Sequence, residues 1–212
     1  MEKLVEGFKK FRLGVFDEKK ELFRQLAQHQ QPQALFITCS DSRLDPCMLT
    51  QTEPGDLFIL RNAGNLVPSY GSNVGGTTAT IEFALGVLGI RDVIVCGHTD
   101  CGVMKAILDP DQIANFPSVK EWLLQAEATR QVIKENYGHL KGEELLIATI
   151  QENVRIQLTH LRTHPIVAAK LRSGAVSLHG WVYSIPTGHM SAYDYKNDRF
   201  ADLLELEAAR KK

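Results

Sequence analysis

The chain has 212 residues, of which 44% are hydrophobic and 23% charged, and its 24 basic and 25 acidic side chains give a formal net charge of −1. This composition is ordinary for a globular protein with a sizeable core, and it excludes a disordered chain, a collagen-like chain and a coiled-coil rod. The charge balance gives no bulk attraction to nucleic acid or to an anionic membrane, so we expect neither as a partner.

The first 30 residues predict an amphipathic helical segment. Leu4, Phe8 and Phe11 share one face at helical spacing, and a second helical piece is expected after Gly14. We therefore expect residues 1–30 to form an arm that contacts a partner subunit.

Three short, continuous apolar runs follow, each typical of a buried parallel strand. They span Ala34–Thr38, Leu57–Leu60 and Asp92–Cys96. Between the second and third runs, residues 75–89 predict a helix that ends at Gly89. Strand, helix and strand at this spacing predict a right-handed crossover, and hence an α/β fold with a mostly parallel sheet.

The second half of the chain predicts mainly helix. The expected elements are helices over residues 119–137 and 143–163, strands over residues 177–185 and around Ala192, and a final helix over residues 202–212. The sequence contains no internal repeat, low-complexity tract or linker, so a single domain over residues 1–212 is the simplest interpretation.

Targeting signals and disulfides are not expected. The charged beginning of the chain has no apolar region typical of a secretory signal. The longest apolar-rich run, Ile81–Ile90, is far shorter than the roughly 18 residues that a membrane span needs. Four cysteines are too few for a disulfide scaffold, so we expect a reducing, cytoplasmic setting in which free cysteines serve more often as metal ligands or nucleophiles.

Chemically active residues follow two of the predicted strands directly. Cys39 comes after the first strand, and His98 and Cys101 come after the third. Ligands of an open parallel sheet bind outside the carboxyl ends of its strands, so these side chains are expected to face one crevice. Thiolate and imidazole suit zinc, and a catalytic zinc keeps three protein ligands and one open position. Cys39, His98 and Cys101 are therefore the predicted zinc ligands.

Asp41 and Arg43 lie in the same loop as Cys39 and are the predicted catalytic pair. A carboxylate beside zinc can ligate the metal or accept a hydrogen bond from zinc-bound water, and an arginine fork can hold it off the metal. The alternative interpretation is an ordinary surface ion pair, worth about 0–1 kcal/mol.

Several segments, in this order along the chain, resemble the β-class carbonic anhydrases. They are Cys39–Pro46, Pro54–Phe58, Arg61–Asn65, Gly97–Gly102 and Leu178–Trp181. The resemblance implies a lyase with one Zn²⁺ per chain that interconverts carbon dioxide and bicarbonate, by attack of a zinc-bound hydroxide that an Asp–Arg dyad orients. It also implies a doubly wound sheet, and a homodimer or dimer-built tetramer in which the N-terminal arm wraps the neighbouring subunit.

Compared position by position, the resemblance places the family's zinc ligands on Cys39, His98 and Cys101. It places the family's Asp–Arg dyad on Asp41 and Arg43. The resemblance places substrate-binding residues on Gln30, Phe58 and Phe83, and Gly102, directly after the last ligand, is assigned with them. Plant-like members carry a tyrosine where this sequence has Phe83, so one hydroxyl is lost there.

The resemblance also bears on regulation. A second subgroup has a bicarbonate-operated off state that uses a tryptophan three residues before the first cysteine, where this chain has Phe36. Arg61 matches a basic residue of that inhibitory site, but arginine is common there in both subgroups. We therefore expect the ungated, plant-like type.

The two thiolate ligands also bear on the pH dependence. They cancel the formal charge of the zinc dication, so activity is expected to climb on the alkaline side of neutral.

Two other functions stay open at this point. The same zinc site could hydrolyse carbon disulfide or carbonyl sulfide, because pocket access decides between these substrates. A non-catalytic, zinc-stabilised scaffold is the other alternative, although structural zinc needs no Asp–Arg pair. A dinucleotide site is rejected because residues 71–76 lack the Gly-x-Gly-x-x-Gly turn after a strand. The proton route is unassigned, with Tyr70 and Asp100 as weak candidates. The expected location is the cytoplasm, where a carbon-fixing compartment could contain the enzyme.

Overall fold

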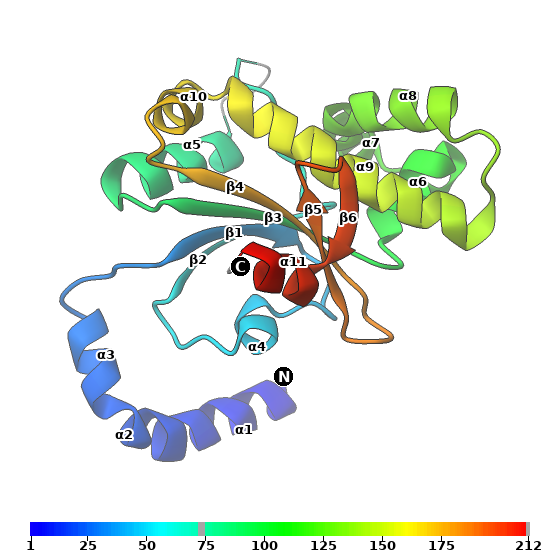
Figure 1. Cartoon of the computed structure of the whole chain (residues 1–212). Coiled ribbons are helices and arrows are strands. Elements are labelled where there is room, and N and C mark those ends of the chain that lie inside the picture. Colours follow the sequence, from blue (N-terminus) through cyan, green and yellow to red (C-terminus); the bar gives the residue numbers. More distant parts are fainter. Residues whose placement is uncertain (72–74, 211–212) are drawn as a thin grey trace.

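A six-stranded sheet in the order β2-β1-β3-β4-β5-β6 runs through the computed structural model, which describes residues 1–71 and 75–210 (Figure 1). The first four strands are parallel and the last two are antiparallel additions at one edge. The strands are β1 (Ala34–Cys39), β2 (Leu57–Asn62), β3 (Asp92–His98), β4 (Ser177–Tyr183), β5 (Met190–Asp194) and β6 (Arg199–Asp202). The predicted α/β fold with a mostly parallel sheet is confirmed.

The sheet is doubly wound, because β1 lies between β2 and β3. The chain leaves β1 through α4 (Pro46–Thr50) toward β2, and returns past β1 to β3 through α5 (Gly76–Glu82) and η2 (Phe83–Val87). Figure 1 shows α4 on the face of the sheet opposite α5. The connections therefore diverge at the carboxyl ends of β1 and β3, which is where open α/β sheets bind their ligands.

Between β3 and β4 the chain forms a helical segment that covers one face of the sheet (Figure 1). Its elements are α6 (Gly102–Leu108), η3 (Pro110–Ile113), α7 (Pro117–Leu123), η4 (Leu124–Ala126), α8 (Glu127–Asn136), α9 (Gly142–Thr163) and α10 (Pro165–Arg172). The larger hydrophobic cluster lies between this layer and the sheet. A smaller cluster, centred on Phe36, Ile94 and Cys96, lies on the other face, toward α4 and the final helix α11 (Leu203–Arg210).

Two glycines let α9 approach the sheet closely. A Cβ placed on Gly180 of β4 would lie 2.9 Å from side-chain carbons of both Val154 and Leu158, and one on Gly97 of β3 would lie 3.0 Å from Val154. Both distances are shorter than carbon–carbon van der Waals contact. The close packing of α9 on β3 and β4 therefore depends on two residues that have no side chain.

We expect Gly180→Ala to destabilise the protein by about 1–3 kcal/mol, because the added methyl overpacks a core that cannot easily yield. Urea unfolding with a constant slope measures this change. Gly138→Ala is the matched control, since its Cβ would meet only a backbone oxygen of Lys134 at an ordinary 3.6 Å. Equal midpoints for the two variants would show that α9 shifts without cost.

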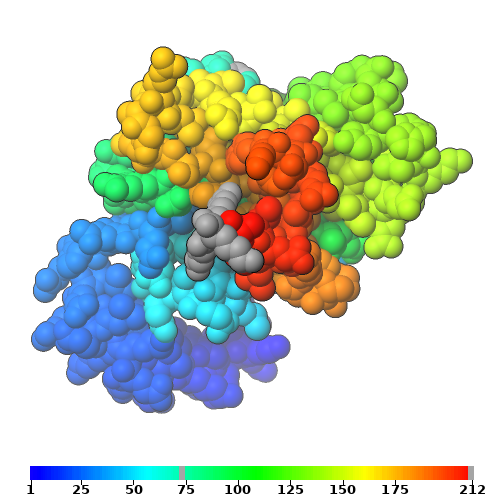
Figure 2. Space-filling view, in the orientation of Figure 1, coloured from blue at the N-terminus to red at the C-terminus, as the bar shows by residue number. Residues whose placement is uncertain are grey.

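The N-terminal arm comprises α1 (Glu2–Lys10), η1 (Phe11–Val15), α2 (Phe16–Glu18) and α3 (Lys20–Leu26). It projects as a lobe beside the sheet domain (Figure 2). Phe11, Phe16 and Phe23 pack their rings together, with centroids 5.2–6.1 Å apart. The expected second helical piece does follow Gly14, in α2 and α3, but the chain stays helical through Gly14 and the turn comes at Lys19.

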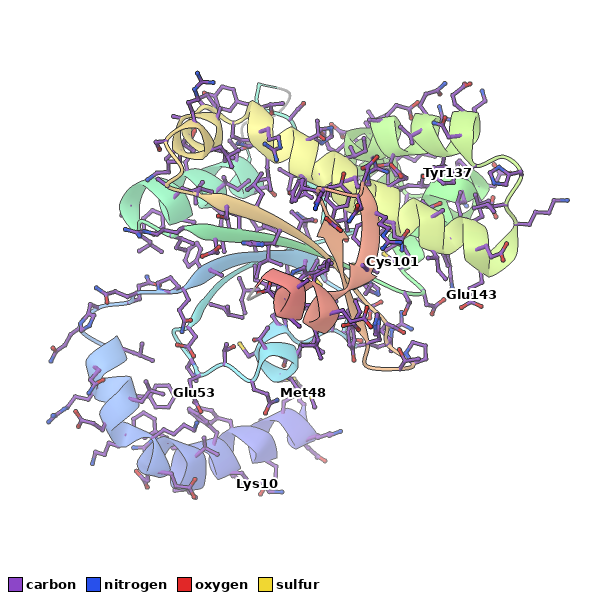
Figure 3. The ribbon with its side chains drawn as sticks, viewed as in Figure 1. Lys10, Met48, Glu53, Cys101, Tyr137 and Glu143 are labelled. Carbon is purple, nitrogen blue, oxygen red and sulfur yellow. The ribbon has the colours of Figure 1, made fainter. Side chains whose placement is uncertain are left out.

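Few contacts hold the arm to the body, so most of its apolar surface is uncovered. Lys19 forms an ion pair with Glu53, which lies on the side of the body that faces the arm (Figure 3). The side chains of Leu4, Phe8 and Leu13 are exposed, with Leu13 77% accessible. Exposed apolar faces of this kind mark interaction surfaces, as expected for an arm that binds another subunit.

Other expectations need correction in detail. The helix expected over residues 119–137 is interrupted at η4 between α7 and α8, and α10 and β6 were not expected. Residues 72–74, within the segment searched for a dinucleotide-binding turn, lie outside the described residues, as do residues 211–212 of the expected final helix. Among the described helices, none has the length and apolarity needed to cross a membrane.

Candidate metal centre and active site

The three predicted ligands meet at the carboxyl ends of β1 and β3. The ligand atoms of Cys39, His98 and Cys101 all lie within 4.8 Å of one another, and all three residues are buried. Cys39 is the last residue of β1 and His98 the last of β3, while Cys101 is the N-cap of α6 (labelled in Figure 3). The doubly wound topology thus brings together residues that are about sixty positions apart in the sequence.

The protonation of His98 suits a metal ligand. Its Nδ1 lies 2.9 Å from the carbonyl oxygen of Thr99, so Nδ1 carries the hydrogen and donates it there. The lone pair is then on Nε2, which is buried and has no hydrogen-bond partner among the described residues. A buried, unpaired acceptor is costly unless something else binds it, and a metal ion between two thiols would do so.

The two cysteine side chains lie close enough to shift each other's pKa. The contact with the Cys101 thiol lowers the pKa of Cys39 to about 4, although burial opposes the shift. The same contact, together with burial, raises the pKa of Cys101. The backbone N–H of Gly64 also donates to the Cys39 sulfur, at 3.4 Å. One thiolate therefore forms readily, and thiolate is the form that binds zinc. The residues present fit a zinc ion.

Asp41 and Arg43 form the expected fork. Nε and Nη2 of Arg43 donate to the two carboxylate oxygens of Asp41, at 2.9 and 2.8 Å, and the Arg43 backbone N–H donates to the first of these oxygens at 2.9 Å. These hydrogen bonds hold the pKa of Asp41 well below its usual range. Oδ2 of Asp41 lies 3.8 Å from Nε2 of His98. An ionised carboxylate thus lies at the edge of the ligand cluster with its orientation fixed.

Arg61 and Asp100 have contacts that the sequence did not reveal. Arg61, on β2, donates to the carbonyl oxygens of Cys39 and Asp41, at 3.1 and 2.7 Å, and so fixes the backbone of the loop after β1. Asp100 accepts a hydrogen bond from Nη1 of Arg43 at 2.9 Å. In the sequence, the only sign of this contact is that Asp100 lies between the predicted ligands His98 and Cys101. Tyr70, the other proton-route candidate, lies against the ring of His164.

The predicted substrate-binding residues do not come together in one chain. Gly102 begins α6 beside Cys101, at the ligand cluster. Phe58 of β2 pairs with Leu35, near the start of β1. Leu35 comes four residues before Cys39, so Phe58 lies about 13 Å from Cys39 along the strand direction. Phe83 lies next to Phe58, with ring centroids 6.1 Å apart. Gln30 precedes β1 altogether. Gln30, Phe58 and Phe83 therefore lie toward the opposite end of the sheet.

The family model for carbonic anhydrase matches residues 34–190. A carbonic anhydrase of Synechocystis sp. is 48% identical over 195 residues, covering 92% of this chain and 71% of that protein. A carbonic anhydrase of Pseudomonas aeruginosa is 46% identical over 210 residues, covering 99% and 95% of the two chains.

Solved structures agree with these matches. The β-carbonic anhydrase CcaA is 46% identical and superposes with a TM-score of 0.94 over 95% of this chain and 91% of its own. A structure described as one of two tetrameric β-carbonic anhydrases of Sordaria macrospora gives a TM-score of 0.81 at 26% identity, over 90% and 95% of the two chains.

Proposed function

Since the chain belongs to the β-class carbonic anhydrase family, we propose that it catalyses the reversible hydration of carbon dioxide to bicarbonate and a proton, with one zinc ion held by Cys39, His98 and Cys101. The observation that carries this proposal is the buried cluster of two thiols and one imidazole with an ionised, arginine-held carboxylate at its edge. A scaffold that used zinc only for stability would not need that carboxylate.

Bound zinc would lower the pKa of a water molecule toward neutrality and so supply the nucleophile for carbon dioxide. The protein's own contribution is orientation. Asp41 accepts a hydrogen bond from the attacking oxygen and so leaves a lone pair of that oxygen directed at carbon dioxide. Arg43 keeps Asp41 ionised and fixes its plane, because the fork occupies both carboxylate oxygens.

We assign the chain to the ungated subgroup. Both oxygens of Asp41 accept hydrogen bonds from Arg43, which favours a carboxylate held off the metal. Phe36 is fully buried against Trp181, and Arg61 is engaged with two backbone carbonyls rather than facing an open anion site. A pH-dependent lag in turnover, or a bond between zinc and Asp41 in crystals grown at neutral pH, would place the chain in the other subgroup.

The activity test is zinc analysis and stopped-flow hydration on one purified sample, from mildly acidic to alkaline pH. We expect about one zinc per chain and activity that rises above neutral pH. The same sample assayed with carbonyl sulfide and carbon disulfide separates the alternative hydrolase, for which those substrates would turn over faster than carbon dioxide. Zinc without turnover of any of the three would indicate a scaffold.

The substrate pocket is proposed to form between two subunits. Gln30, Phe58 and Phe83 lie toward the end of the sheet opposite the ligand cluster, so they can serve a zinc site only if a second copy brings them there. Ile59, Phe83 and Val87 present exposed apolar side chains near that end. We therefore propose a homodimer, or a tetramer built from dimers, in which each zinc site uses the other subunit's Gln30 and Phe58.

A mixed dimer tests this arrangement. Gln30→Ala removes one hydrogen bond to the substrate, so the homodimer should lose about 2- to 10-fold in kcat/KM. A heterodimer of Gln30→Ala with Cys101→Ala, isolated through two different tags, contains one zinc site, which takes an intact Gln30 from the Cys101→Ala chain. We expect its kcat/KM per zinc to return to the wild-type value. A value equal to that of the Gln30→Ala homodimer would place Gln30 in its own subunit's site.

We place the enzyme in the cytoplasm, because its four cysteines are free thiols. A carbon-fixing compartment within it is compatible with the cyanobacterial relatives.

A further inference from the structure

Asp100 connects the two loops that build the site. It lies between His98 and Cys101 on the loop after β3, and its Oδ2 accepts a hydrogen bond of 2.9 Å from Nη1 of Arg43, on the loop after β1. Its backbone carbonyl oxygen accepts a second, longer hydrogen bond of 3.3 Å from Nη2 of the same side chain. The other carboxylate oxygen of Asp100 pairs with Lys105 on α6.

These contacts divide the guanidinium of Arg43 between two carboxylates. Nε and Nη2 donate to Asp41, and Nη1 donates to Asp100. The fork fixes Asp41 relative to Arg43, but the Arg43 side chain is itself 43% exposed, so a further contact is needed to fix its guanidinium relative to the loop after β3. Asp100 anchors the far side of the guanidinium to the segment that carries two of the three proposed ligands. The position of Asp41 relative to those ligands is thereby fixed through Arg43.

Lys105 balances the charge of this arrangement. Arg43 alone would face two carboxylates with a single positive charge, so Asp100 would compete with Asp41 for it. The Lys105 ammonium supplies the second positive charge. Asp100 and Lys105 are both about half exposed, at 52% and 45%, and exposed ion pairs add little to stability. The contribution of Asp100 to stability is therefore small, and its geometric effect on Arg43 is the larger one.

The backbone at Asp100 offers a clean way to remove the side chain. Its φ of 59° is in the left-handed region, which glycine and asparagine adopt with little strain and alanine does not. Asp100→Gly therefore deletes the carboxylate with the loop conformation retained. Asp100→Asn keeps an acceptor oxygen for Arg43 but removes the charge.

We propose that Asp100 is a positioning residue of the hydration reaction, which orients Arg43 and through it the carboxylate of Asp41; the inference rests on the function proposed above. In the zinc-loaded protein, Asp100→Gly should lower kcat/KM by about 10- to 100-fold, the range for misplacement by a fraction of an ångström to one ångström. Asp100→Asn should lower it less. Zinc content should stay at the wild-type value. The control is Glu127→Gln, which breaks the exposed ion pair with Arg130 on α8 and should change none of these quantities.

Two measurements separate positioning from a merely structural effect. In an Arg43→Met background, Asp100→Gly should have no further effect on kcat/KM, because a residue that acts through Arg43 has nothing left to act on. The Nε–H proton resonance of Arg43 should be sharp in the wild type and in Asp100→Asn, and broadened by solvent exchange in Asp100→Gly. Additive losses in the double variant, loss of zinc from Asp100→Gly, or an unchanged Arg43 resonance together with wild-type turnover would each overturn the inference.

Asp41→Asn, assayed beside these variants, distinguishes failure of the inference from failure of the proposed function. If Asp41→Asn is slow and Asp100→Gly is not, the inference alone is wrong. If Asp41→Asn turns over at the wild-type rate, the dyad itself is wrong, and Asp100 has no catalytic group to position.

Discussion

We expect Cys101→Ala to abolish carbon dioxide hydration and to remove zinc from the purified protein. Structural zinc sites with four ligands bind with roughly 10–16 kcal/mol, so one ligand contributes about 3–4 kcal/mol, or a factor of about 100 to 1,000 in affinity. Cys101 is also the N-cap of α6, and loss of the metal leaves the buried Nε2 lone pair of His98 without a partner. Metal analysis after dialysis against a weak chelator, with stopped-flow rates on the same sample, measures both effects.

Cys47→Ala is the matched control for this loss. Cys47 is also a free cysteine, but it lies on α4, outside the ligand cluster. The Cys47→Ala variant should retain zinc and turnover. The Cys101→Ala variant should in addition unfold at a lower temperature than Cys47→Ala, because a metal that binds only the native state stabilises that state. Full activity in metal-free protein, or equal zinc content in the two variants, contradicts the ligand assignment.

The ligand cluster was predictable because its positions follow from the strand pattern. Continuous apolar runs located β1 and β3, and parallel strands in one sheet end at one edge, so Cys39 and His98 had to lie close together. The fork between Asp41 and Arg43 was predictable for a similar reason, since its partners are two residues apart in one loop.

Other features depend on information that the local pattern does not hold. The separation of Gln30 and Phe58 from the ligands follows from strand register, and a pocket shared between two chains leaves no periodic signal in one of them. The contact between Asp100 and Arg43 depends on a left-handed φ at Asp100, which directs its side chain toward another loop. The helical break at Lys19 rather than Gly14 reflects packing of Phe16 against Phe23, which overrides the low helix propensity of glycine.

Asp41→Asn should keep zinc and lose most turnover, about 100- to 1,000-fold in kcat/KM, within the range for loss of a positioned acid–base group. The amide has almost the size of the carboxylate and keeps one acceptor oxygen for Arg43. It lacks the negative charge and the second oxygen, so it cannot at once bind the fork and accept a hydrogen bond from the attacking oxygen. Asp45→Asn is the control from the same loop: Asp45 caps α4 by accepting from the N–H of Met48 at 3.2 Å, and asparagine caps helices equally well.

The pH dependence of the wild type bears on the same assignment. Hydrogen bonds from Arg43 lower the pKa of Asp41 below its usual range, so the charged form is favoured and the carboxylate stays ionised from mildly acidic to alkaline pH. An activity rise above neutral pH therefore cannot be the titration of Asp41, and the small residual activity of Asp41→Asn should rise over the same pH interval as the wild type. A wild-type rate in Asp41→Asn, or a shift of its profile to another interval, would remove Asp41 from the role given to it.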